Sequence, residues 1–340
     1  MKRVLVTGGA GFIASNFIRK ILKTGQYYVI NVDKLNYCGT RFNVERSYNF
    51  ETHQIEKTDL TNYCFYKTDI NNAEFISDIL KRHKVDILYH FAAQSHVDTS
   101  FGNSLQFVND NIMGTSTLLE CARDYGGLEK FIHVSTDEIY GSVNESIDDI
   151  VLKYGIYNAT NPYAATKASA EIMCKSYLIS YKLPIIITRS NNVYGPGQFW
   201  EKLVPKIIYN LNRGKKIPVY GDGSAKRKYI YVDDICDAYL KIMKQGKIGD
   251  IYEMESQDEL TCLQMAERLI SIVRPDDNPH QWIKYVADRA FHDVRYVVNP
   301  QKIKELGWEP TTPLDQGLKK TAEWYLNYAI PNRHWVQQIE

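Results

Sequence analysis

The start of the chain predicts a strand, a glycine-rich turn, a helix and a second strand that ends in an acid. Apolar Val4–Val6 precedes Gly8 and Gly11, and apolar Tyr28–Val32 leads to Asp33. Glycines in such a turn let the backbone approach a pyrophosphate, and amides at the helix start attract its charge. An acid about 20 residues further on can accept hydrogen bonds from both ribose hydroxyls and disfavours a 2′-phosphate. The spacing therefore predicts a dinucleotide-binding unit that prefers NAD to NADP.

Strand and helix patterns continue to alternate along the chain, without a low-complexity linker. This alternation predicts an α/β fold: a doubly wound parallel sheet (Rossmann) with a second, smaller α/β substrate domain. We expect residues 1–190 to form the NAD-binding domain and 191–340 mainly the second domain, with about 229–254 returning to the main sheet. Residues 40–63 are polar and lack periodicity, which predicts a loop with room for one short helix.

The charge balance and the cysteines argue against several classes of protein. The chain has 41 Lys and Arg against 40 Asp and Glu, whereas nucleic-acid-binding domains carry a basic excess. Its six cysteines are scattered, without a C-x-x-C pair or a Cys/His cluster, which argues against a disulfide scaffold or a zinc site. The apolar run before Gly8 is too short for a signal peptide, and about 18 consecutive apolar residues occur nowhere. We expect a soluble, cytoplasmic protein with no metal, nucleic-acid partner or membrane contact.

Two adjacent acids follow the strand predicted at Lys130–Val134. Open α/β sheets bind ligands just beyond the carboxyl ends of their strands, so Asp137 and Glu138 are expected where a substrate would lie. Taken alone, an acid pair after a strand also suits a turn or a helix cap. The combination with other motifs is what favours a catalytic pair.

A tyrosine and a lysine lie four residues apart at Tyr163 and Lys167, a spacing that places both on one face of a helix. A nearby cation eases ionisation of a phenol. Ordinary surface neighbours show the same spacing. Earlier in the chain, the small residues Ala92 and Ala93 follow a predicted strand and would let a cofactor lie against the backbone. His96, on its own, suits a hydrogen-bonded structural role.

Together these motifs resemble the extended short-chain dehydrogenases/reductases, and within that superfamily the nucleotide-sugar 4,6-dehydratases. The resemblance lies in Thr7–Ile13, Ser135–Gly141 and Tyr163-x-x-x-Lys167. It continues through Asn191–Pro196, Glu201–Pro205, Gly221–Ser224, Arg227, Tyr231–Asp234, Arg295–Tyr296 and Leu306–Trp308. It covers nearly the whole chain except 40–63. The later motifs are most similar to UDP-glucose dehydratases, with dTDP-glucose dehydratases next.

The resemblance implies a reaction in which NAD is reduced and then regenerated. Tyr163, assisted by Lys167, would take the proton of the sugar 4-hydroxyl while C4 gives up a hydride, and Thr136 would hydrogen-bond that oxygen. Glu138 would then remove the C5 proton, and Asp137 would protonate the departing 6-hydroxyl. Asp137 must be protonated for this, so its pKa is expected to be raised. The product would be a 4-keto-6-deoxy sugar of the kind used in deoxysugar (rhamnose-type) biosynthesis.

The resemblance also implies the binding residues and the assembly. NAD would contact Gly8, Gly11, Phe12, Ile13, Asp33, Lys34, Asp69, Ile70, Ala92, Ala93, Tyr163 and Lys167. The nucleotide-diphosphate hexose would contact Ser95, His96, Asn192, Glu201, Lys202, Leu203, Arg227 and Arg295, although either arginine alone also suits a solvated surface charge. A homodimer would pack through helices near 103–125 and 161–181.

Trp200 departs from the family pattern, which usually has proline before Glu-Lys-Leu. With this indole beside the expected sugar site, the hexose of the substrate can be either glucose or N-acetylglucosamine. Two other functions stay open as well. A UDP-sugar 4-epimerase or decarboxylase would not need the adjacent acids. A catalytically silent nucleotide-sugar-binding protein would not need the threonine, tyrosine and lysine of the proton-transfer set.

Overall fold

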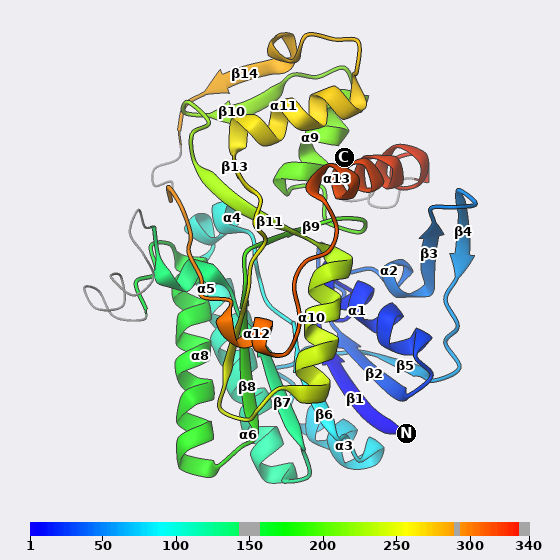
Figure 1. Cartoon of the computed structure of the whole chain (residues 1–340). Helices are drawn as coiled ribbons and strands as arrows, with labels where there is room; N and C mark the ends of the chain where they lie inside the picture. Colours follow the sequence, from blue (N-terminus) through cyan, green and yellow to red (C-terminus); the bar gives the residue numbers. More distant parts are fainter. Residues whose placement is uncertain (143–156, 289–292, 333–340) are drawn as a thin grey trace.

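The fold is centred on one parallel sheet. The computed structural model describes residues 1–142, 157–288 and 293–332. Its seven-stranded sheet has the spatial order β12-β8-β7-β6-β1-β2-β5, with every neighbouring pair parallel (Figure 1). The strands are β1 (Lys2–Thr7), β2 (Tyr27–Asp33), β5 (Tyr63–Lys67), β6 (Ile87–His90), β7 (Lys130–Val134), β8 (Ile185–Ser190) and β12 (Ile251–Met254). The order reverses between β1 and β6, which is where doubly wound sheets bind ligands.

Helices cover both faces of this sheet, because its strands are apolar on both sides. In β1, Val4 and Val6 belong to the core beneath one helical layer, whereas Leu5 between them belongs to the core beneath the other. The first layer contains α1 (Phe12–Lys23) and α10 (Val232–Gln245). The second contains α3 (Ala73–His83), α6 (Gly114–Tyr125) and α8 (Pro162–Tyr181). The predicted doubly wound parallel sheet is confirmed.

Short helical segments precede α6 along the chain. They are α4 (Val97–Gly102), α5 (Ser104–Phe107) and the π-helical η1 (Val108–Met113), where the sequence predicted one helix over about 103–125. The predicted loop at 40–63 is wrong in part. It contains α2 (Phe42–Glu45), as the sequence allowed, and then an antiparallel hairpin of β3 (Arg46–Asn49) and β4 (Gln54–Lys57).

The second half of the chain builds two smaller sheets at one end of the main sheet (Figure 1). One contains β9 (Asn192–Tyr194), β11 (Lys226–Tyr231) and β13 (Glu259–Thr261), and the other pairs β10 (Ile217–Tyr220) with β14 (Ile283–Val286). Besides α10, the described helices of this half are α9 (Leu203–Asn212), α11 (Cys262–Val273), η3 (Pro279–Trp282), α12 (Gln301–Glu305), α13 (Leu314–Trp324) and η4 (Tyr325–Ala329). Within the described residues, no helix combines the length and the apolar character that a bilayer crossing requires.

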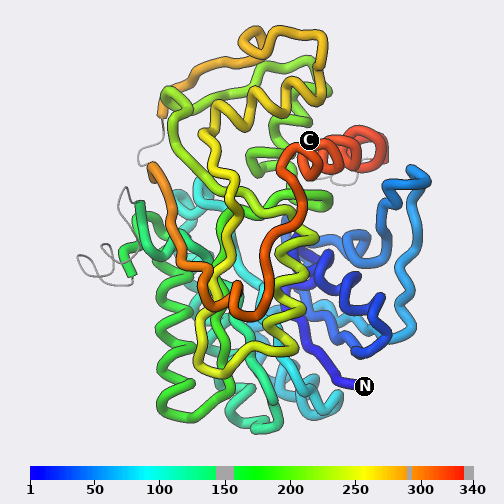
Figure 2. Tube along the Cα trace, viewed as in Figure 1, coloured from blue at the N-terminus to red at the C-terminus, as the bar shows by residue number. Residues whose placement is uncertain are grey.

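One strand from this later half lies in the main sheet. After α10 the chain runs back, forms β12 beside β8, and returns toward α11, a path drawn in yellow tones in Figure 2. The two-domain division stays a prediction, but its parts share this sheet. Just beyond the carboxyl end of β7, the chain forms the short helical turn η2 (Asp137–Tyr140).

Candidate active site

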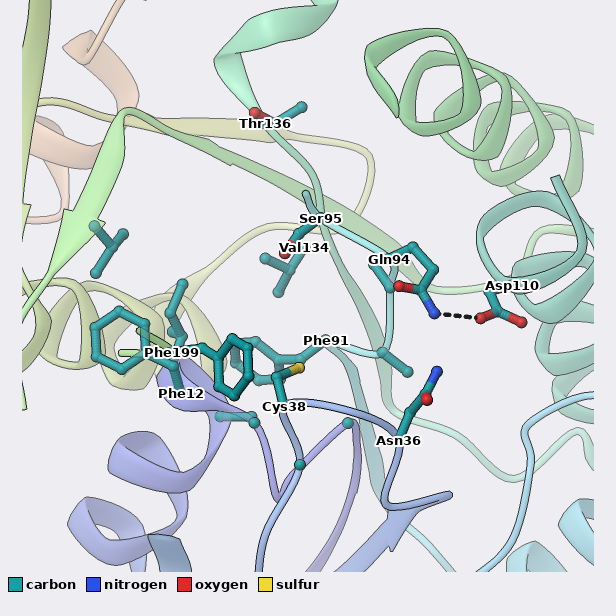
Figure 3. A pocket seen from close by; sticks show the side chains of 18 of the residues that line it. Phe12, Asn36, Cys38, Phe91, Gln94, Ser95, Asp110, Val134, Thr136 and Phe199 are labelled. Carbon is teal, nitrogen blue, oxygen red and sulfur yellow. Dashed lines mark hydrogen bonds between the residues drawn. The ribbon is translucent and has the colours of Figure 1, made fainter. Parts of the chain in front are cut away.

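A cavity of about 330 Å³ lies at the carboxyl ends of the main-sheet strands. Its walls come from the ends of β1, β2, β6, β7 and β8, from the start of η2, from α8, and from the segment 190–202. Figure 3 shows side chains around it, including apolar Phe12, Phe91 and Val134 and the hydrogen bond of 2.8 Å from Gln94 to Asp110. One space is therefore shared by the glycine-rich turn and the adjacent acids.

Most of the residues predicted for the site line this cavity. They are Gly8, Gly11, Phe12, Ile13, Asp33, Lys34, Asp69, Ile70, Ala92, Ala93, Ser95, Thr136, Asp137, Glu138, Tyr163, Lys167, Asn192, Glu201 and Lys202. Four other predicted residues, His96, Leu203, Arg227 and Arg295, are not among the lining residues. The roles assigned to all of them stay predictions.

The glycine-rich turn leaves the start of α1 open toward the cavity. Gly8 has φ +70, and a Cβ there would lie 2.7 Å from the Cα of Ala92, so only glycine permits this approach of β1 to β6. Gly11 precedes α1 without a side-chain cap, and the first turn of the helix contains no acid. Uncapped amides at a helix start are a ready site for a phosphate group.

Asp33 is fixed beside this helix start. Its two carboxylate oxygens accept hydrogen bonds from the backbone amides of Ala10, at 3.0 Å, and Leu35, at 2.7 Å. Burial raises the pKa of Asp33, and both of these amides act in the opposite direction. Lys34 next to it forms ion pairs with Asp69, at 3.3 Å, and Asp110, at 2.9 Å. An open helix start, a close glycine and an oriented carboxylate fit a dinucleotide such as NAD.

The two adjacent acids are the first residues of a short helical turn, η2. Thr136 caps η2 by accepting a hydrogen bond from the amide of Glu138, and its hydroxyl also donates to Asp137 at 3.2 Å. Asp137 is buried, and the Asn191 amide donates to its Oδ2 at 2.7 Å. Burial raises the pKa of Asp137 to about 7, against the lowering effect of Asn191. Asp137 can therefore carry a proton near neutral pH, as a general acid must.

Glu138 faces different partners from those of its neighbour. The side-chain amide of Asn161 donates to Glu138 Oε2 at 3.2 Å, and the hydroxyl of Tyr296 lies 3.4 Å from the same oxygen. Burial raises the pKa of Glu138, whereas Asn161 and the charge of Arg227 lower it. The turn thus places two carboxyls in one cavity but in separate hydrogen-bonding environments, which suits one acid and one base.

Tyr163 and Lys167 enter the cavity from the first turns of α8. Asn161 caps this helix by accepting from the amide of Ala164 at 2.8 Å, and Pro162 occupies its first position, a strong start signal. Burial, followed by the charge of Glu138, raises the pKa of Tyr163. Burial lowers the pKa of Lys167 to about 8, and its ammonium donates to the Val134 carbonyl at 2.6 Å. The raised pKa of Tyr163 is opposite to the lowering that its spacing from Lys167 predicts.

The far wall of the cavity contains a charged pair at the end of the segment 190–202. Lys202 donates to the Ser95 carbonyl at 2.7 Å, and Glu201 accepts from the Tyr37 hydroxyl at 3.2 Å. His96 lies 3.8 Å from Glu201. These contacts join the segment before α9 to the loops after β2 and β6.

The two predicted arginines have protein partners in the structure. Arg227 donates to the carbonyls of Lys226, at 2.7 Å, and Asp293, at 2.8 Å, and its guanidinium lies 4.5 Å from the centre of the Tyr296 ring. Arg295 is paired with Glu259 at 2.5 Å.

Sequence reasoning missed Asn191, which makes the direct contact with Asp137. The motif Asn191–Asn192 was visible, but only the second asparagine was selected for a role. The doublet itself was a signal, since an amide side chain next to Asn192 can also donate to a carboxylate, and both asparagines line the cavity. Asp110, which binds Lys34 from η1, gave no such signal because it lies within a helical pattern.

Comparisons with known proteins agree with this geometry. A model of the GDP-mannose 4,6 dehydratase family matches residues 5–321. The dTDP-D-glucose 4,6-dehydratase of Mus musculus is 41% identical over 329 residues, which cover 95% of this chain and 88% of that protein. The trifunctional UDP-glucose 4,6-dehydratase/UDP-4-keto-6-deoxy-D-glucose 3,5-epimerase/UDP-4-keto-L-rhamnose-reductase of Arabidopsis thaliana is 41% identical over 327 residues. The match covers 95% of this chain and 47% of that protein. The crystal structure of DesIV, the dTDP-glucose 4,6-dehydratase of Streptomyces venezuelae with NAD bound, has a TM-score of 0.87 and 35% identity and covers 99% of both chains. These matches confirm the resemblance found in the motifs.

Proposed function

Because this chain belongs to the GDP-mannose 4,6 dehydratase family, we propose that it is an NAD-dependent nucleotide-hexose 4,6-dehydratase. The observation that carries the proposal is the pair of adjacent acids in one cavity with a tyrosine and a lysine, where burial raises the pKa of Asp137 to about 7. Removal of water from neighbouring carbons needs an acid and a base side by side. Inversion at C4 alone moves no proton at C5 and loses no hydroxyl group, so it does not need this carboxyl pair.

The first stage of the reaction is oxidation at C4 of the hexose. Bound NAD would supply the redox chemistry, since its nicotinamide can take a hydride from a sugar carbon and return it. The open start of α1 would hold its pyrophosphate, and Asp33 its ribose. Tyr163 takes the proton of the 4-hydroxyl, and Thr136 hydrogen-bonds the same oxygen. Lys167, one turn further along α8, favours the ionised phenol against the cost of burial.

The second stage is the loss of water between C5 and C6. The ketone at C4 acidifies the C5 proton, which Glu138 removes, and Asp137 gives its proton to the departing 6-hydroxyl. Hydride return to C6 and a proton at C5 complete a 4-keto-6-deoxy sugar. Since the relatives named above act on dTDP-glucose or UDP-glucose, the substrate is a nucleoside-diphosphate glucose, for which UDP stays the predicted nucleotide.

Incubation with UDP-glucose, dTDP-glucose and UDP-N-acetylglucosamine, each followed by NMR of the product, tests the proposal. We expect a product that has lost water and carries a methyl group at C5. A product with inverted C4 and no loss of water would identify an epimerase, and an unchanged substrate in all three reactions would indicate a silent binding protein.

Glu138→Gln tests the assignment of the base. The amide cannot accept the C5 proton, whereas oxidation at C4 does not involve this group. We expect reduced nicotinamide to build up on the enzyme, seen by its near-ultraviolet absorbance, while water loss falls by about 100-fold or more. Tyr163→Phe is the matched comparison, because it should stop even the first hydride transfer. Normal dehydration by the Gln variant would remove Glu138 from this role.

We also infer a homodimer that acts in the cytoplasm. Apolar side chains stand exposed on neighbouring helices, with Leu105 of α5 80% exposed and Ile179 of α8 67% exposed. Burial of such a surface against a second copy would stabilise both. All six cysteines have free thiols, which suits a reducing compartment.

Ile179→Asp tests the dimer by light scattering. We expect the variant to be monomeric, because a carboxylate cannot be buried there without a partner. Ile248→Asp, at an apolar residue that is 54% exposed beyond α10, is the control and should leave the mass of a dimer unchanged. A monomeric wild type would contradict the assembly.

A further inference from the structure

A tyrosine outside the cavity lining lies between the proposed base and a second buried acid. The hydroxyl of Tyr296 is 2.6 Å from Asp293 Oδ2 and 3.4 Å from Glu138 Oε2. Tyr296 is 7% exposed and Asp293 is 5% exposed, so bulk water has little access to these contacts. One phenol, with a single proton, therefore faces two carboxyl groups.

The distances decide where the phenol proton lies. An oxygen separation of 2.6 Å is typical of a hydroxyl that donates to a carboxylate, whereas 3.4 Å exceeds the usual range for such a bond. Tyr296 therefore donates to Asp293 and presents a lone pair of its oxygen toward Glu138. Asp293 is oriented by Thr160, whose hydroxyl donates to Oδ1 at 2.7 Å, and Arg227 packs on the Tyr296 ring.

Glu138 gains from this arrangement only when it carries a proton. As a carboxylate it has the Asn161 amide as a donor, but Tyr296 has no second proton to offer it. As a carboxylic acid, Glu138 could donate a hydrogen bond to the lone pair of the Tyr296 hydroxyl oxygen. We propose that Tyr296 and Asp293 are positioning residues that favour proton uptake by Glu138, by providing an acceptor for its protonated form.

This inference rests on the proposed dehydration. In that step the C5 proton moves to Glu138, the C–H electron pair forms the double bond to C6, and the 6-hydroxyl leaves as water with the proton of Asp137. Tyr296 keeps its own proton toward Asp293 throughout. After burial, which is the larger cause, the charge of Asp293 also raises the pKa of Glu138, in the direction that proton uptake requires.

Tyr296→Phe is the test, since it keeps the ring beside Arg227 and removes only the hydroxyl. We expect kcat for water loss to fall by about tenfold, the effect of one hydrogen bond, with KM nearly unchanged. Reduced nicotinamide should accumulate during turnover, because oxidation at C4 precedes the slowed step. A merely structural role would not produce this spectral change.

Tyr229→Phe is the matched control. Tyr229 is a buried tyrosine of β11, and its hydroxyl has no hydrogen-bond partner among the described residues, so its removal should leave kcat and the spectrum unchanged. Asp293→Asn is the second variant. Its amide could donate to Tyr296, which would turn the phenol proton toward Glu138 and favour the carboxylate, so kcat should fall at least as far as in Tyr296→Phe.

The outcomes separate this inference from the proposed function. A wild type that removes water, together with Tyr296→Phe or Asp293→Asn variants of normal kcat, would overturn the inference alone. Slow variants without accumulated reduced nicotinamide would also overturn it, since the slow step would then lie elsewhere. A wild type that removes water from none of the three substrates would overturn both.

Discussion

The side chain of Asp137 shows how a single residue is prepared for its task by its surroundings. Its burial favours the neutral form, whereas the hydrogen bond from Asn191 favours the charged form, and burial is the larger effect. The pKa of Asp137 therefore rises to about 7 and not further. A general acid with such a value is about half protonated at neutral pH and can regain its proton after each turnover.

Asn191→Ala should shift the pH dependence of the reaction. Because the acid must be protonated, kcat is expected to fall as the pH rises through the pKa of Asp137, about 7. Loss of the donor at 2.7 Å removes an interaction that favours the charged form, so the pKa rises and the alkaline limb of the profile should move to higher pH. A pH profile of kcat measures this. An alkaline limb that moves to lower pH would contradict the assignment of the acid.

Single residues also show which contacts could be predicted from the sequence and which could not. The acid pair, Tyr163 and Lys167 were predicted from their combination, and all four residues line one cavity. Arg295 was selected as a cation, yet it forms a pair with Glu259 at 2.5 Å, and no local pattern indicates such a partner. Lys228, the residue after Arg227, is likewise paired with Glu255 at 2.5 Å. Ion pairs between distant segments depend on the tertiary structure.

Among the elements, the turn between β1 and α1 was predicted closely and the hairpin of β3 and β4 was not. The turn is specified by local chemistry, since its glycines, the following helix and Asp33 all appear in register. The hairpin has one exposed and three half-buried residues in β3 and only exposed residues in β4, so no alternation of buried and exposed side chains marks it. A strand without a buried face lacks the period that a sequence can reveal.

Gly8→Ala should show how much the close approach in this turn contributes. The new Cβ would lie 2.7 Å from the Ala92 Cα at a φ of +70, so both strain and overlap should destabilise the fold, by about 2–4 kcal/mol. Gly25→Ala is the control, because Gly25 has a φ of +65 but a Cβ added there would have no neighbouring atom within 4 Å. This substitution should lower the free energy of unfolding by about 1 kcal/mol. Urea unfolding measures both, and the NAD content of the purified protein should fall only for Gly8→Ala. Equal losses in the two variants would show that the overlap costs nothing.

At the scale of the whole molecule, a buried ionic network joins elements from distant parts of the chain. Arg189 of β8 is paired with Glu171 of α8 at 2.7 Å and with Glu253 of β12 at 3.0 Å. Tyr140, at the end of η2, hydrogen-bonds both Arg189 and Glu253. The backbone amide of Asn299 donates to Glu253 at 2.7 Å. The network thus connects the turn that carries the two acids to the far edge of the sheet.

Arg189→Ala should be severely destabilising, because it leaves two buried carboxylates without their cation. We expect the free energy of unfolding in urea to fall by about 3–5 kcal/mol. Arg268→Ala breaks the exposed pair with Asp315, at 2.6 Å, and should cost less than about 1 kcal/mol. Similar losses in both variants would contradict the importance of burial for this network.

The position of β12 has a consequence for biosynthesis. Residues 1–190 cannot complete their own sheet, since the neighbour of β8 is supplied by Ile251–Met254. During synthesis on the ribosome, one edge of β8 stays unpaired until about sixty more residues have been added to the chain. An unpaired strand edge exposes N–H and C=O groups that can pair with other chains. A cofactor half expressed by itself should therefore aggregate, and nascent copies of this protein should depend on chaperones during that interval.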